Sequence, residues 1–240
     1  MMIFELLGKQ TVSERLPMGL GGRFYGVYPA LVNDIKDPDG QGRIKIMLPW
    51  SPDGKGSRYE AWARMATMMG GNNRGTWFIP DVNDEVLVCF EAGNPRRPYV
   101  VGALWNGSDA PPEQMDDSGE NNTKTIRSRN GVTITIDDSN GQEKLNMKTP
   151  GGQEITLKDG PGAIEIQDSN GNSIRMETGG ITVNASSKIT ISSGGPVEVS
   201  TSLLTVNAGM SRFSGTVQAD TVITNSVISA SQTPCAGSIW

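Results

Sequence analysis

Residues 153–176 read QEITLKDGPGAIEIQDSNGNSIRM, in which three apolar–polar–apolar triplets alternate with turn-forming residues. The same unit returns every 7 to 11 residues. The triplets are Ile134-Thr135-Ile136, Leu145-Asn146-Met147, Ile155-Thr156-Leu157, Ile164-Glu165-Ile166, Ile174-Arg175-Met176, Ile181-Thr182-Val183, Ile189-Thr190-Ile191, Val197-Glu198-Val199 and Leu204-Thr205-Val206. Successive residues of a strand point to opposite faces, so each triplet offers two apolar side chains to one face. Strands this short must stack on copies of themselves, within the chain or between chains.

The repeat predicts a β-solenoid or an intertwined β-helix, which is a mechanical shape. Its spacing falls from 9–11 residues to 7–8 residues along the chain, so we expect a rod that tapers toward the C-terminus. About twelve strands stacked ~4.8 Å apart would give a rod on the order of 60 Å long.

The aromatic residues are distributed unevenly. Of 14 aromatic residues, only Phe213 and Trp240 follow residue 107. An ordinary globular core uses aromatic bulk to bury area, so the composition predicts a compact first half and a fibrous second half.

Four segments follow from this division. Residues 23–107 contain five strand-like segments, which suit a small barrel, most often an OB-fold. Residues 108–125 are polar and acidic and are typical of a linker. Residues 1–22 form an arm that docks on a partner or is loosely held. The predicted fold is all-β, with an OB-fold barrel followed by a C-terminal intertwined trimeric β-helix over residues 126–240.

Composition excludes several classes of function. The net charge is −5, and no segment is basic enough to suggest nucleic-acid binding. The chain has no His, the commonest general base and metal ligand. Cys89 and Cys235 do not make a disulfide framework. No apolar run approaches the ~20 residues of a membrane helix, and the first residues lack a basic signal region. We therefore expect assembly in the cytoplasm, no enzyme activity, no catalytic residues and no cofactor.

One acidic cluster resembles a calcium loop. Asp34, Asp37 and Asp39 lie close together, but an EF-hand needs a Glu at its twelfth position, and that position is Lys45. A turn in which Asp side chains accept local hydrogen bonds is the favoured interpretation, and no metal site is predicted here.

The first half resembles the OB-fold domain of contractile-tail spike proteins, which include phage baseplate assembly protein V and the VgrG spikes of type VI secretion. Five blocks in this order carry the resemblance: residues 32–34 with VND followed by 37–46 with DPDGQGRIKI, 48–50 with LPW, 62–66 with WARMA, 79–88 with IPDVNDEVLV and 93–102 with GNPRRPYVVG. The resemblance implies a homotrimer on the tail axis, in which an OB-fold collar precedes a three-chain β-helix.

The chain departs from the family in three respects. Larger spikes carry a hub-forming region before the OB-fold, so the resemblance implies that the baseplate hub is a separate protein. Residues 108–125 leave no room for the lysozyme domain of some relatives. The His-rich, iron-binding tip of some phage spikes is also absent, which implies a bare tip or one capped by a PAAR-like protein.

The end of the sequence supplies the candidate tip residues. In a threefold trimer three copies of Cys235 would lie near the axis, where thiolates could bind a metal or oxidise; a small buried apolar role is the alternative. Ile239 and Trp240 are candidates for contacting a tip protein, because Trp is a common anchor in protein interfaces.

These observations predict the central spike of a contractile tail, most simply a phage baseplate, which docks hub and tip proteins and punctures the target cell envelope. One alternative is a spike of a type VI or extracellular contractile injection system. An alternative of another class is a β-helical polysaccharide depolymerase, which the scarcity of aromatic residues after residue 106 disfavours.

Overall fold

The computed structural model describes residues 22–52, 56–160, 162–226 and 228 of the 240-residue chain. The described residues form an all-β structure whose single helical element is the 3-10 turn η1 (Glu91–Gly93). None of the described helices is long and apolar enough to cross a membrane. The chain divides after Lys188 into two units.

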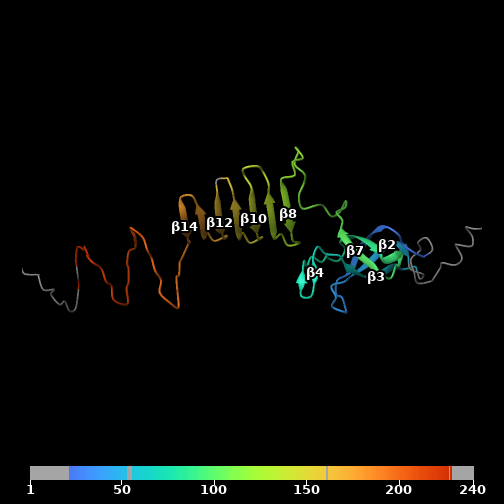
Figure 1. Ribbon diagram of the computed structural model, residues 1–240, viewed down its shortest axis with the longest axis horizontal. Helices are drawn as coiled ribbons and strands as arrows, with labels where there is room; N and C mark the ends of the chain where they lie inside the picture. Colours follow the sequence, from blue (N-terminus) through green and yellow to red (C-terminus); the bar gives the residue numbers. More distant parts are fainter. Residues whose placement is uncertain (1–21, 53–55, 161, 227, 229–240) are drawn as a thin grey trace, which may run out of the picture. The chain divides into compact units, whose positions relative to one another are not determined.

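A closed barrel occupies the N-terminal part of the first unit (Figure 1). Its strands are β1 (Val27–Asp34), β2 (Ile44–Pro52), β3 (Arg58–Met65), β6 (Glu85–Phe90) and β7 (Pro98–Ala103). They run in the order β1-β2-β3-β7-β6, and β6 pairs with β1 to close the ring. All barrel pairs are antiparallel except β3 with β7. This arrangement confirms the predicted OB-type barrel.

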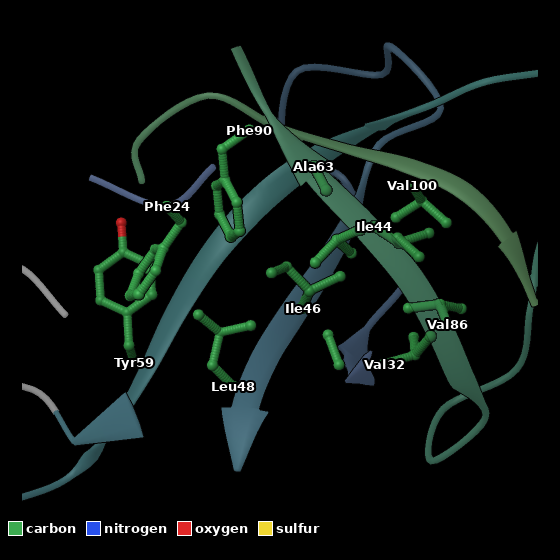
Figure 2. Packing of buried hydrophobic residues seen from close by; sticks show 12 residues of the cluster. Phe24, Val32, Ile44, Ile46, Leu48, Tyr59, Ala63, Val86, Phe90 and Val100 are labelled. Carbon is green, nitrogen blue, oxygen red and sulfur yellow. The ribbon is translucent and has the colours of Figure 1, made fainter. Parts of the chain in front are cut away.

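Alternating apolar residues fill the barrel (Figure 2). In β2 the buried apolar residues are Ile44, Ile46 and Leu48, and in β6 they include Val86 and Val88. Their neighbours in each strand are less buried, as the period of two requires. The alternation read from the sequence therefore specifies the inner face correctly.

An aromatic group packs at the Phe24 side of this core. Phe24 lies 5.3 Å from Tyr28, 5.2 Å from Trp50 and 5.4 Å from Phe90, measured between ring centroids. The Trp50 indole N–H donates a 2.9 Å hydrogen bond to the Pro29 carbonyl. The Tyr59 hydroxyl is buried and donates to the Pro95 carbonyl. Tyr59 is thus a core residue and not a surface for stacking bases.

Asp37 organises the loop between β1 and β2. Its side chain is 5% exposed and accepts hydrogen bonds from the backbone N–H groups of Asp39, Gln41 and Arg43. The Arg43 guanidinium donates to Asp37 at 2.6 Å and to Asp39 at 2.5 Å. The bond from Arg43 is the largest cause that lowers the pKa of Asp37, and the backbone N–H groups add to it. The acidic cluster is therefore occupied by the protein's own donors, in the turn role expected from the sequence.

The repeat begins as a seven-stranded antiparallel sheet that follows chain order (Figure 1). Its strands are β8 (Thr123–Arg127), β9 (Thr133–Asp137), β10 (Lys144–Lys148), β11 (Glu154–Lys158), β12 (Ala163–Gln167), β13 (Ser173–Glu177) and β14 (Gly180–Asn184). The sheet thus starts inside the segment 108–125 that the sequence assigns to a linker. Each strand pairs with its neighbours in the same chain. In residues 123–184 the inner strands therefore find both of their pairing partners within one chain.

The second unit has a different backbone arrangement. Residues 189–226 form no strand, and none of them forms a backbone–backbone hydrogen bond with another described residue. Figure 1 draws them as a trace that bends repeatedly (orange to red). The triplets Ile189-Thr190-Ile191, Val197-Glu198-Val199 and Leu204-Thr205-Val206 lie here, so their predicted strands are not formed within a single chain.

Candidate assembly interface

Two continuous apolar rows run across one face of the sheet β8–β14. The register aligns the two apolar residues of every triplet with those of the next strand. One row is Ile126, Ile134, Met147, Ile155, Ile166, Ile174 and Val183. The other is Ile136, Leu145, Leu157, Ile164, Met176 and Ile181, with Lys124 at its β8 end. Because strand side chains alternate, both rows lie on the same face.

The opposite face carries the polar middle residues of the triplets. Across the strands this row reads Thr125, Thr135, Asn146, Thr156, Glu165, Arg175 and Thr182. Asn146 donates to Glu154 at 2.6 Å and to Thr156 at 2.9 Å, and Arg175 pairs with Glu165 at 3.1 Å. Cross-strand pairs of this kind contribute roughly 0.2–1 kcal/mol each. Polar side chains of this face bond to one another across the strands, and the face suits contact with water.

The turns between strands fix the register. Asp168 accepts hydrogen bonds from the backbone N–H groups of Asn170 and Asn172 and from their side-chain amides. These bonds, led by the Asn172 side chain, lower the pKa of Asp168 to about 2. Gly171 has φ of 85°, in the left-handed region that glycine occupies without strain. A shift of the strand register by one residue would move the apolar side chains to the other face. The turns fix the register and so keep the apolar side chains on one face.

The apolar face is uncovered in the single chain. Apart from half-buried Leu145, its apolar residues are each at least 36% exposed. Monomeric soluble proteins rarely expose contiguous apolar patches larger than a few hundred Å², and larger ones mark interaction sites. The apolar face of the sheet β8–β14 is therefore a candidate interaction surface.

The second unit needs a partner for a further reason. Its apolar residues are even more exposed, between 55% for Ile189 and 99% for Ile228. Its described residues form no backbone–backbone hydrogen bond, although side chains accept hydrogen bonds from the Gly195 and Leu203 N–H groups. Backbone N–H and C=O groups are paired when a protein buries them, so covering these side chains requires further hydrogen-bond partners.

The candidate tip residues lie outside this region. Cys235, Ile239 and Trp240 all fall outside the described residues. Cys89 is half-buried on β6. No group of three or more Cys, Asp or Glu side chains that could hold a metal occurs among residues 22–52, 56–160, 162–226 and 228.

A second exposed surface was not identified from the sequence. The aromatic residues of the first half predicted a compact core, yet Trp77, Phe78 and Trp105 are 75%, 70% and 70% exposed. The adjacency of Trp77 and Phe78 was the available signal. Residues that follow one another in extended chain cannot both face one core.

Two family models match the chain, and they follow one another in sequence. Residues 28–105 match the type VI secretion system/phage-baseplate injector OB domain. Residues 144–210 match the phage baseplate V C-terminal trimerisation domain, which supports a homotrimer. The second match covers β10–β14 and continues through residues 189–210, which form no backbone–backbone hydrogen bond among the described residues.

Curated relatives include type VI secretion spike proteins. VgrG1b of Pseudomonas aeruginosa is 28% identical over 127 residues, which are 50% of this chain and 17% of the relative. VgrG3 of Vibrio cholerae is 27% identical over 120 residues, or 50% of this chain and 11% of the relative. The V. cholerae actin cross-linking toxin VgrG1 is 27% identical over 116 residues, or 45% and 10%.

The chain thus matches less than a fifth of the length of these relatives. The matched part is too small a share of these relatives to show a whole-protein activity for this chain. The chain thus contains an injector OB domain over the barrel, followed by a phage baseplate V C-terminal trimerisation domain over the repeat.

Proposed function

We propose that three copies of this chain form the central spike of a contractile injection machine. The observation that carries the proposal is the pair of apolar rows on β8–β14, which the described chain leaves uncovered. Covering apolar surface contributes about 25 cal/mol per Å², so two apolar rows that cross the whole sheet would supply a large share of the assembly free energy. A three-sided prism with the apolar rows inside covers all three faces at once.

The spike would act by transmitting force. Within residues 123–184 each inner strand is paired on both sides, and carboxylate-bonded turns hold the register. Interleaved strands from three chains would extend this pairing through residues 189–226 and leave no sheet edge along the rod. A depolymerase would need an aromatic-lined surface for sugar stacking, and only Phe213 and Trp240 are aromatic after residue 106.

We assign the spike to a phage tail baseplate, assembled in the host cytoplasm. The trimerisation domain matched by residues 144–210 is described for phage baseplate V, which supports this setting. A type VI apparatus is the alternative, because the curated relatives are type VI spike proteins. Immunogold labelling of contractile tails purified from producing cells would support the phage setting, and labelling confined to type VI sheaths would contradict it.

The proposed partners are a baseplate hub protein, a PAAR-like tip protein and, transiently, the target cell envelope. We place the tip contact at Ile239 and Trp240, with Cys235 beside them. Deleting Ile239 and Trp240 should weaken capture of the tip protein in a pull-down and leave the trimer intact. Unchanged capture would exclude this contact.

A matched pair of variants tests the interface. Ile155 lies in an apolar row, and its neighbour Thr156 lies in the polar row of the same strand. Ile155→Lys should bury a charge in the prism and prevent assembly, whereas Thr156→Lys should leave it unchanged. By light scattering we expect about three times 25.7 kDa for the wild type and Thr156→Lys, and a smaller mass for Ile155→Lys. A trimer for Ile155→Lys, or a monomeric wild type, would contradict the proposal.

A further inference from the structure

Three exposed aromatic side chains border an open hollow on the first unit. Trp77, Phe78 and Trp105 line a space of about 1280 Å³, together with Ile126 of β8. Trp77 and Phe78 follow the hairpin of β4 (Gly70–Gly71) and β5 (Arg74–Gly75), and Trp105 follows β7. Exposed large aromatic residues gathered in this way are typical of protein interfaces.

The display of these side chains is ordered. The Trp77 ring lies against Gly42, where an added Cβ would come within 3.0 Å of the ring. The Thr76 N–H donates to the Met69 carbonyl at 3.0 Å, and the Thr67 hydroxyl donates to the Thr76 carbonyl at 2.9 Å. The local contacts therefore hold Trp77 with much of its ring turned outward, so an incoming partner meets a preformed aromatic surface.

The aromatic surface is continuous with the apolar face of the sheet. Ile126, which lines the hollow, is also the first residue of one apolar row and pairs with Ile134. Beside it, Arg129 in the β8–β9 turn forms a 2.8 Å ion pair with Asp81 of the barrel. A chain that covers the apolar row at its β8 end therefore meets the aromatic surface next.

We infer that the surface formed by Trp77, Phe78 and Trp105 is occupied by a second copy of this chain. The inference rests on the proposed trimer, and it adds a contact made by the barrel to the contact made by the repeat. Continuity with the apolar row identifies the occupant, because the copy that covers Ile126 is the one positioned to cover Trp77. The aromatic groups would fix the barrels against neighbouring copies at the wide end of the spike.

Photo-crosslinking of the full chain tests the inference. The photoreactive residue p-benzoylphenylalanine replaces Trp77 in one variant and Trp105 in a second. A third variant carries it at Thr156, on the polar face of the sheet. After irradiation and full denaturation, we expect a covalent two-chain band at Trp77 and Trp105 at least about tenfold above that at Thr156. Peptide mapping should place the cross-link on residues 22–140 of the other copy.

Each other outcome overturns the inference. A trimer by light scattering with cross-links only inside one chain, or with none, would show that no second copy covers the aromatic surface. Cross-links that form only in complete tails, and to a different protein, would make it a hub contact. A monomeric full chain would overturn the proposed function as well, so the mass measurement separates the two failures.

Discussion

Residues 123–184 and residues 189–226 carry the same alternating triplets, yet they satisfy their backbones differently. In the first region the backbone N–H and C=O groups bond to neighbouring strands of the same chain. In the second region no backbone–backbone hydrogen bond forms among the described residues. The difference separates two ways of building a trimer. Three sheets that are already paired within their own chains can pack through their apolar faces. Segments without intrachain backbone hydrogen bonds must instead form these bonds with other copies.

Turn chemistry explains where the change occurs. The strand connections of the first region contain Asn130-Gly131, Asn140-Gly141, Gly151-Gly152 and Asn170-Gly171, with Gly131, Gly141, Gly152 and Gly171 at positive φ. Asn-Gly and Gly-Gly are strong hairpin signals, because their residues tolerate that conformation. After Asn184 the first connection, residues 185–188, contains no Gly or Asn, whereas the next connection again contains Gly194-Gly195. The chain therefore lacks a hairpin signal at the point where the intrachain sheet ends.

The largest expected effect comes from removing the open region. A chain ending at Asn184 keeps the barrel and the sheet but loses every strand that we propose to exchange between copies. Each lost hydrogen bond contributes about 1 kcal/mol net, and the interleaving that resists dissociation is lost with them. We expect resistance to SDS without boiling to disappear, as read from gel mobility.

The matched control for this truncation ends at residue 226 and should keep SDS resistance. If the chain ending at Asn184 is as resistant as this control, face-to-face packing alone holds the trimer, and the distinction between the two regions fails.

A smaller effect is expected at a hairpin turn of the first region. Gly171→Ala forces a side chain into φ of 85°, although the new Cβ would meet nothing closer than 3.9 Å. The strain should cost roughly 1 kcal/mol per chain and lower Tm by about 2–4 °C. Gly179→Ala is the control, because that glycine has no positive φ and no neighbour within 4 Å. Equal Tm values in a calorimeter for both variants would show that this turn does not hold the register.

The smallest effect is a pH dependence in the same turn. The folded pKa of Asp168 is about 2, below its ordinary value, so its hydrogen bonds contribute stability above that ordinary value. This contribution is lost as the pH falls from about 4 toward 2. The wild-type Tm should therefore decline over this range, and Asp168→Asn should show a shallower decline. A parallel decline in both would assign the acid sensitivity to other groups, such as Asp37.

The sequence predicts much of this architecture, for reasons that particular residues illustrate. Val86, Val88 and Phe90 alternate with less buried neighbours, so the barrel strand could be read directly. The triplet Ile155-Thr156-Leu157 likewise defines a strand with one apolar face. These features depend on local periodicity, which one sequence contains.

Other features depend on which chain supplies a partner. Ile181-Thr182-Val183 forms β14, whereas Ile189-Thr190-Ile191 has the same pattern and forms no strand in one chain. A triplet does not specify whether its neighbour belongs to the same copy. The exposure of Trp77 was not predicted either, because composition alone assigns an aromatic residue of the barrel domain to the core.

Amide hydrogen exchange of the purified full chain tests the central claim most directly. If residues 189–226 exchange backbone hydrogen bonds with other copies, their amides should be protected for hours, like those of β9–β13, in a sample of about three times 25.7 kDa. Complete exchange of residues 189–226 within seconds, while β9–β13 stay protected, would contradict the claim that other copies complete this backbone.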